Sequence, residues 1–126
     1  MFDLKEGIKS PSAVVNLAVA GVANAAVIYT IPALAGQLVG TKSVKIRKVI
    51  LHNNLAGNTT VLIGNGVGGA FVALLPALDS INGLTDTYDS ESDLPPAESF
   101  ANITAYPVAL GVGTSIDIQL EVEIIG

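Results

Sequence analysis

Residues 115–125 (SIDIQLEVEII) alternate apolar and polar side chains more cleanly than any other part of the chain. Every second position is aliphatic: Ile116, Ile118, Leu120, Val122 and Ile124. The positions between them carry Asp117, Gln119, Glu121 and Glu123. This period of two predicts an antiparallel strand with one face in a core and the other toward solvent.

Shorter strand signals precede this segment, separated by turn residues at a spacing of about 8–12 residues. They cover residues 13–20, 25–31, 43–52, 59–63, 70–75 and 99–106, with one more short strand near 84–88 inside a long acidic loop. Helix is the rival interpretation for 13–20, which is rich in alanine, but its β-branched residues favour a strand. About eight short strands predict one all-β domain over residues 12–126, an antiparallel β-sandwich or jelly roll.

In the strand over residues 43–52 (SVKIRKVILH), the apolar residues switch from even to odd positions in the middle, a change of parity. Val44 and Ile46 fall on one side of a regular strand, whereas Val49 and Leu51 fall on the other. The switch lies at Arg47-Lys48. It predicts either a β-bulge or a strand that passes from one sheet to the other.

Composition excludes several classes of function. The chain has no cysteine, which rules out disulfides, thiolate metal sites and cysteine nucleophiles. Half of its 126 residues are hydrophobic, and 13% are charged, against about 25% in an average protein. An apolar, weakly charged chain of this kind is expected to cover part of its surface in a homo-oligomer.

The charges are also segregated along the chain. All six basic residues lie at or before Lys48, and nine of the eleven acids lie at or after Asp79, with a net charge of −5. We therefore expect no nucleic-acid surface. No basic stretch leads into an apolar core at the N-terminus, and the apolar run over residues 12–35 is broken by Gly, Asn and Pro, so neither a signal peptide nor a membrane span is predicted.

Residues 1–11 are predicted to form an N-terminal arm. They mix charges with Phe2, Leu4 and Ile8 and end at Pro11. Arms of this composition are either disordered or docked on a neighbouring subunit, so these apolar residues are candidate assembly contacts.

A short basic patch gives two more candidate contacts, Lys45 and Arg47. The patch also includes Lys42 and Lys48, and it could pair with the acidic residues of 115–125 either across a sheet or between subunits. Ordinary solvated faces are the alternative, and the one that we favour.

The segment Gly64–Gly69 matches the G-x-G-x-x-G pattern of dinucleotide-binding loops. That site also requires a helix directly after the glycines, whereas AFVALLP follows here. We therefore expect a turn in which glycine supplies a positive φ, and no cofactor.

The only histidine, His52, has no G-x-S-x-G partner motif, and a small hydrolase using it is the least favoured function. Clustered acids are more suggestive, because oxygen-rich loops can hold Ca²⁺. The candidates are Asp86, Asp89, Glu91 and Asp93, with Glu98 nearby, but their spacing does not match an EF-hand loop. A solvated acidic loop is the preferred interpretation, and no metal site is predicted. Glycoside hydrolysis by these acids is disfavoured because the chain has no Trp.

Three segments carry a family resemblance: residues 29–32 (YTIP), residues 44–54 (VKIRKVILHNN) and residues 60–64 (TVLIG). Together they resemble small β-sandwich virion proteins of tailed phages, among them capsid decoration (cement) proteins and accessory tail proteins. The resemblance implies a non-enzymatic subunit, often trimeric, that is assembled in the host cytoplasm and clamps a capsid or surface lattice. Two alternatives stay open: a carbohydrate- or ligand-binding module, either with or without Ca²⁺ dependence through residues 86–98, and a pilus-like filament subunit.

Overall fold

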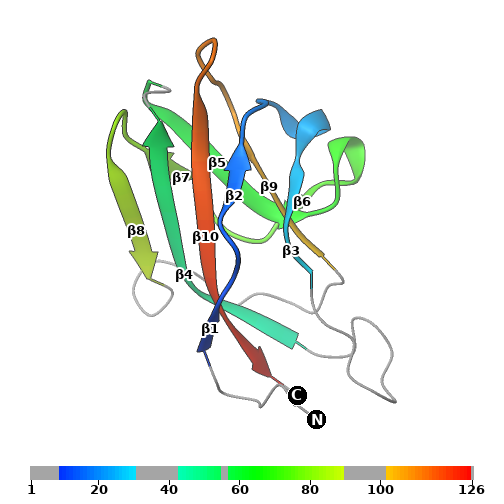
Figure 1. The fold of residues 1–126 in the computed structure, drawn as a ribbon. Coiled ribbons are helices and arrows are strands. Elements are labelled where there is room, and N and C mark those ends of the chain that lie inside the picture. The colour runs from blue at the N-terminus through cyan, green and yellow to red at the C-terminus, as the bar shows by residue number, and fades with distance from the viewer. Residues whose placement is uncertain (1–8, 31–42, 55–56, 90–101, 126) are drawn as a thin grey trace.

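The computed structural model describes residues 9–30, 43–54, 57–89 and 102–125, which form two antiparallel five-stranded sheets packed face to face (Figure 1). The predicted all-β sandwich is therefore confirmed. The helical turns in this part of the chain are two 3-10 segments of three residues each, η1 (Val22–Asn24) and η2 (Gly68–Ala70). No helix among the described residues is long and apolar enough to span a bilayer.

The first sheet has the strand order β1-β10-β4-β8, and β2 pairs with another stretch of β10. Its strands are β1 (Lys9–Pro11), β2 (Val15–Leu17), β4 (Ser43–Asn54), β8 (Thr85–Asp89) and β10 (Ser115–Ile125). The strictly alternating segment is thus β10, the strand that joins both N-terminal strands to β4. Within the predicted arm, Lys9–Pro11 pairs with β10 of the same chain, whereas Phe2, Leu4 and Ile8 lie outside the described residues.

The second sheet has the order β3-β9-β5-β6, and β7 pairs with the first half of β5. Its strands are β3 (Ala26–Thr30), β5 (Thr59–Asn65), β6 (Val72–Ala73), β7 (Leu78–Ser80) and β9 (Asn102–Pro107). Strand β7 was not predicted. It lies at the start of the segment that the sequence presents as an acidic loop. Its side chains alternate, since Leu78 and Ser80 are buried while Asp79 between them is exposed.

A β-bulge explains the parity switch in β4. Lys48 is opposite Glu121 and Ile46 is opposite Val122, which leaves Arg47 as the extra residue. The extra residue lets Ile46 before the bulge face the core together with Val49 and Leu51 after it, and all three are fully buried. Of the two predicted explanations the bulge is confirmed, and β4 stays in one sheet.

The core lies between the two sheets. It is aliphatic throughout and takes residues from both layers: Leu17, Ile28, Ile46, Val49, Leu51, Val61, Ile63, Leu75, Leu78, Ile103, Ala105, Ile116, Ile118, Leu120 and Val122. Four polar residues of the described part of the chain are also buried: Ser12, Asn53, Ser80 and Thr104. The side-chain amide of Asn53 donates to the Gly57 carbonyl at 2.8 Å, and its Nδ2 lies 3.3 Å from the Ser80 hydroxyl. These contacts connect the end of β4 to β7.

Candidate functional site

The predicted basic contact residues lie on the outer face of the first sheet. Arg47 Nε is 2.6 Å from Glu123 Oε1, and both side chains are partly buried. The pairing across the sheet, one of the two predicted arrangements, is therefore present within the chain for these two residues. A contact of Lys45 and Arg47 with another subunit stays a prediction, and Arg47 would enter it with its charge already paired.

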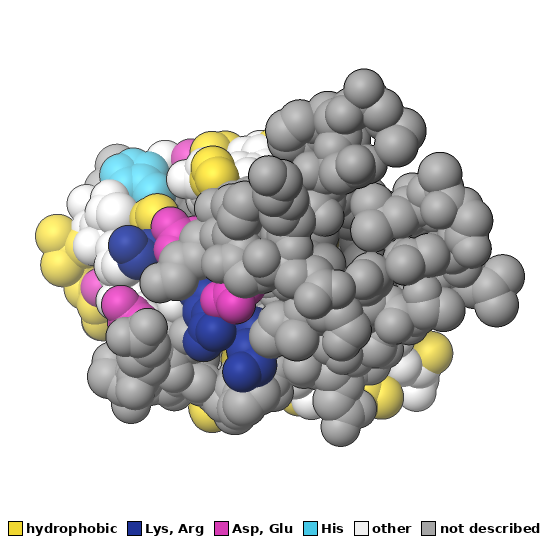
Figure 2. Space-filling model, turned by 90° about the horizontal axis from the view of Figure 1, so that it is seen from below, with side chains coloured by type: hydrophobic (Ala, Val, Ile, Leu, Met, Phe, Trp, Pro, Cys, Tyr) yellow, Lys and Arg dark blue, Asp and Glu magenta, His cyan; other side chains and the backbone are white. Residues whose placement is uncertain are grey.

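Opposite charges interleave over the rest of this face. The Cα register places Lys48 between Glu121 on β10 and Asp89 on β8, and Lys45 opposite Glu123. Figure 2, which looks onto the lower end of the sandwich, shows the basic side chains directly beside acidic ones. This surface is of mixed sign, so it offers no strong electrostatic attraction to a polyanion.

A polar cluster lies higher on the same face, where β2, β10 and β4 meet. Asn16 Nδ2 donates to Asp117 Oδ1 at 2.7 Å, and Asn54 Nδ2 donates to Asp117 Oδ2 at 3.0 Å. Both amides also donate to the Ser115 hydroxyl. The bonds from Asn16 and Asn54 lower the pKa of Asp117, because they stabilise its charged form. The cluster fastens three strands together and holds this carboxylate ionised.

His52 is exposed on β4 and faces Thr85, whose Oγ1 is 2.7 Å from its Nδ1. The strand predicted over residues 43–52 continues two residues beyond His52, to Asn54. Asp117 is its cross-strand neighbour in the register, yet both carboxylate oxygens are bound by asparagine amides. Ser115 likewise bonds to amides and not to the imidazole. In the part of the chain that the structure describes, these residues do not form a nucleophile–base–acid relay.

Of the calcium candidates, the structure describes Asp86 and Asp89, and it does not bring these two together. Asp86 and Asp89 are three positions apart on β8 and therefore lie on opposite faces of the strand. Asp86 Oδ2 accepts a hydrogen bond from the Ile81 amide at 3.0 Å. Glu91, Asp93 and Glu98 lie outside the described residues. Within residues 9–30, 43–54, 57–89 and 102–125, no three acidic or histidine side chains gather where they could hold a metal ion.

The glycine segment is a turn packed onto the second sheet. Gly66 and Gly68 have φ values of 89° and 61°, and only the three-residue η2 follows before β6. A 3-10 turn of this length does not provide the helix N-terminus that a pyrophosphate requires. Thr104 Oγ1 donates to the Gly66 carbonyl at 2.7 Å, and so holds the turn against β9. The geometry agrees with the predicted positive-φ turn.

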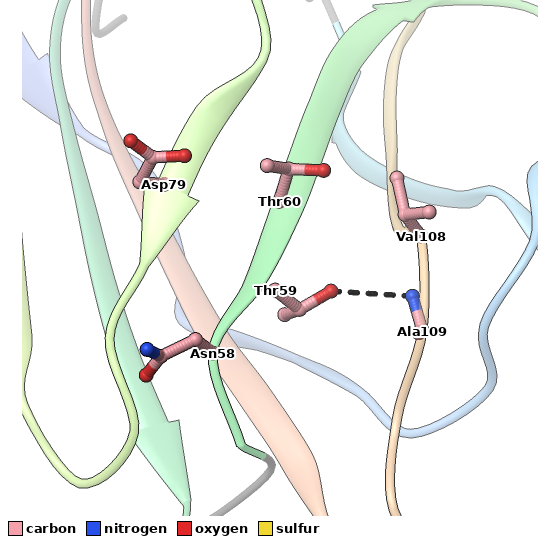
Figure 3. Close-up of a pocket in the computed structure, with 6 residues that line it drawn as sticks. All are labelled: Asn58, Thr59, Thr60, Asp79, Val108 and Ala109. Atoms are coloured by element: carbon pink, nitrogen blue, oxygen red, sulfur yellow. Dashed lines mark hydrogen bonds between the residues drawn. The ribbon is translucent and has the colours of Figure 1, made fainter.

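A shallow pocket of about 360 Å³ lies where β5, β7 and the end of β9 meet (Figure 3). Its lining residues are Asn58, Thr59, Thr60, Asp79, Val108 and Ala109. Two of its polar groups serve the fold: Thr59 Oγ1 accepts from the Ala109 amide at 3.2 Å, and Asn58 Oδ1 accepts from the Asn82 amide at 2.9 Å. One carboxylate beside a valine and two threonines suits weak binding better than catalysis.

The most distinctive surface is the upper end of the sandwich in Figure 1, where four connecting segments meet. We call residues 18–25, 57–58, 81–84 and 108–114 the loop end. None of these residues is charged. Several large aliphatic side chains are nevertheless exposed there: Val19, Ile81, Leu84, Val108 and Val112. Sequence reasoning missed this surface, because its members are scattered over the chain and carry no titratable group.

No protein-family model matches the chain, and no curated protein is significantly similar to it.

Proposed function

We propose that this protein is a non-enzymatic structural subunit that self-assembles, with a capsid decoration (cement) or other virion subunit as the specific role. The loop end carries the proposal. A monomer rarely gathers several exposed aliphatic side chains at one end, and such surfaces usually mark a contact with another protein.

The polar groups support the same role. They connect strands of the same chain. This holds for the Asn16–Asn54–Asp117 cluster, for the Arg47–Glu123 ion pair and for the hydrogen bonds beside the pocket. Groups used in this way stiffen a scaffold, whereas catalysis needs side chains aimed at a substrate. The specific virion role rests on the resemblance of 29–32, 44–54 and 60–64, of which the last two lie on β4 and β5. Homo-oligomer formation, with a trimer favoured, and attachment to a second lattice protein belong to this proposal.

A ligand-binding module is the second candidate, and the pocket beside Asp79 favours it. It would take a small uncharged or cationic group against Val108, because the pocket offers one carboxylate, two threonine hydroxyls and apolar area. Calcium dependence would have to come from acids beyond Asp86 and Asp89, since these two lie on opposite faces of β8.

Thermal unfolding of the full chain separates the two candidates. A self-assembling subunit gains stability by mass action, so a tenfold rise in protein concentration should raise Tm by about 3 °C. Addition of millimolar calcium should leave Tm unchanged. A Tm that is independent of protein concentration but rises with calcium would contradict the proposal and favour the ligand-binding module.

A further inference from the structure

We propose that Asn82 is a site of spontaneous deamidation, which the fold permits there and prevents at Asn65. The chain has eight asparagines, and these two are followed by glycine. Glycine has no Cβ to hinder attack by its own amide nitrogen, so Asn-Gly is the pair in which an asparagine is most readily lost by this reaction. The reaction needs no partner protein and is independent of self-assembly.

The reaction consumes water and releases ammonia. The backbone nitrogen of Gly83, after losing its proton to solvent base, attacks the side-chain carbonyl carbon of Asn82. A new C–N bond forms, the bond to the side-chain NH2 breaks, and ammonia leaves behind a five-membered succinimide ring. Water then opens the ring at one carbonyl to give an aspartate, or at the other to give an isoaspartate. Both products carry a new carboxylate at this position.

Asn82 and Gly83 occupy the turn between β7 and β8, and both are exposed (Figure 1). The Leu84 amide donates to the Ile81 carbonyl at 3.0 Å, which closes the turn, and Gly83 has a φ of 74°. Among the described residues, no hydrogen bond engages the side-chain amide of Asn82 or the backbone N–H of Gly83. The attacking nitrogen and the leaving group are therefore both open to solvent.

Asn65 carries the same sequence signal in the opposite environment. Its Nδ2 donates to the Asn102 carbonyl at 2.7 Å, and the side chain is half-buried. The next residue, Gly66, accepts a hydrogen bond from Thr104 Oγ1 at 2.7 Å, and a Cβ on it would lie 2.4 Å from the Ala70 carbonyl oxygen. Rotation of the Asn65 side chain toward the Gly66 nitrogen would break the bond to β9, so the reaction requires this closely packed turn to open first.

Modification at Asn82 changes both the charge and the backbone of its turn. It adds a negative charge to a chain of net charge −5, and it places that charge on the loop end. Asp86 Oδ2 already accepts from the Ile81 amide at 3.0 Å, so a second carboxylate would stand in the same turn. An isoaspartate also lengthens the main chain by one carbon, which displaces the Leu84 amide from the Ile81 carbonyl.

The test is peptide mapping by mass spectrometry after incubation of the full chain at mildly alkaline pH, where more of the attacking amide is deprotonated. The peptide with Asn82 should gain about 1 Da at least about ten times faster than the peptide with Asn65, which reacts only after local opening. In urea, which removes the fold, the two peptides should react at similar rates. Asn82→Gln should abolish the fast reaction, because glutamine would have to form a six-membered ring. Asn65→Gln is the matched control and should retain it.

Two results would overturn the assignment. One is a rate at Asn65 that equals or exceeds the rate at Asn82 in the folded chain. The other is a folded chain in which the Asn82 peptide keeps its mass while the unfolded chain reacts. Both concern the chemistry of one turn, so self-assembly stands or falls by its own measurement.

Discussion

Gly64→Ala is expected to destabilise the protein by about 1–3 kcal/mol, the range of an overpacked core site. Gly64 is buried on β5 and pairs with Ala73 on β6. A Cβ at this position would lie 2.1 Å from the Val72 carbonyl oxygen and 2.7 Å from the Phe71 ring. The oxygen belongs to the backbone, and the ring is stacked edge-on against Tyr106 at 5.1 Å, so relief requires β6 to move away from β5.

Gly69→Ala is the matched control for this change. It lies in the same glycine-rich turn, its φ is not positive, and nothing lies within 4 Å of a Cβ built there. We expect its free energy of unfolding to stay within about 0.5 kcal/mol of the wild-type value. Urea unfolding of both variants measures the difference. Equal stabilities would contradict the close packing of this turn on β5.

Leu51→Ala is expected to cost about 2–5 kcal/mol in the free energy of unfolding, as for other large-to-small changes in a core. Leu51 is fully buried and belongs to the cluster between the sheets. Its neighbour Ile50 points to the outer face of the same strand and is only partly buried. Ile50→Ala should therefore cost less than half as much, because it removes less buried surface and leaves no closed cavity.

A comparison of Leu51→Ala with Ile46→Ala tests the bulge at Arg47. If β4 paired with β10 without the bulge, one of Ile46 and Leu51 would face solvent, because a shift of one residue exchanges the faces of a strand. Ile46→Ala and Leu51→Ala should both be strongly destabilising in urea unfolding. A small effect at Ile46 beside a large one at Leu51 would contradict the bulged register.

The sequence predicted those parts of the fold that leave a periodic signal. The alternation of residues 115–125 identified β10, and the parity switch near Arg47 located the bulge. Strands β1 and β7 were missed because three residues are too few to show a period. The predicted strand over 70–75 is reduced to Val72–Ala73, since the preceding turn continues through η2.

The candidate site was harder to predict, because it is made by tertiary contacts. Asp117 is bound by Asn16, a residue from the other end of the chain, and no local motif marks that pair. Arg47 and Glu123 were predictable as opposite charges, but the register that joins them depends on the bulge. The loop end draws on four separate segments, and what they share is the absence of charge.

Sedimentation equilibrium of the full chain over a wide concentration range tests self-assembly most directly. We expect one discrete species whose mass is a small multiple of 12.8 kDa, with a trimer as the favoured state. An average mass that keeps growing with concentration would indicate an open filament in place of a closed oligomer. A mass of 12.8 kDa at every concentration would contradict self-assembly.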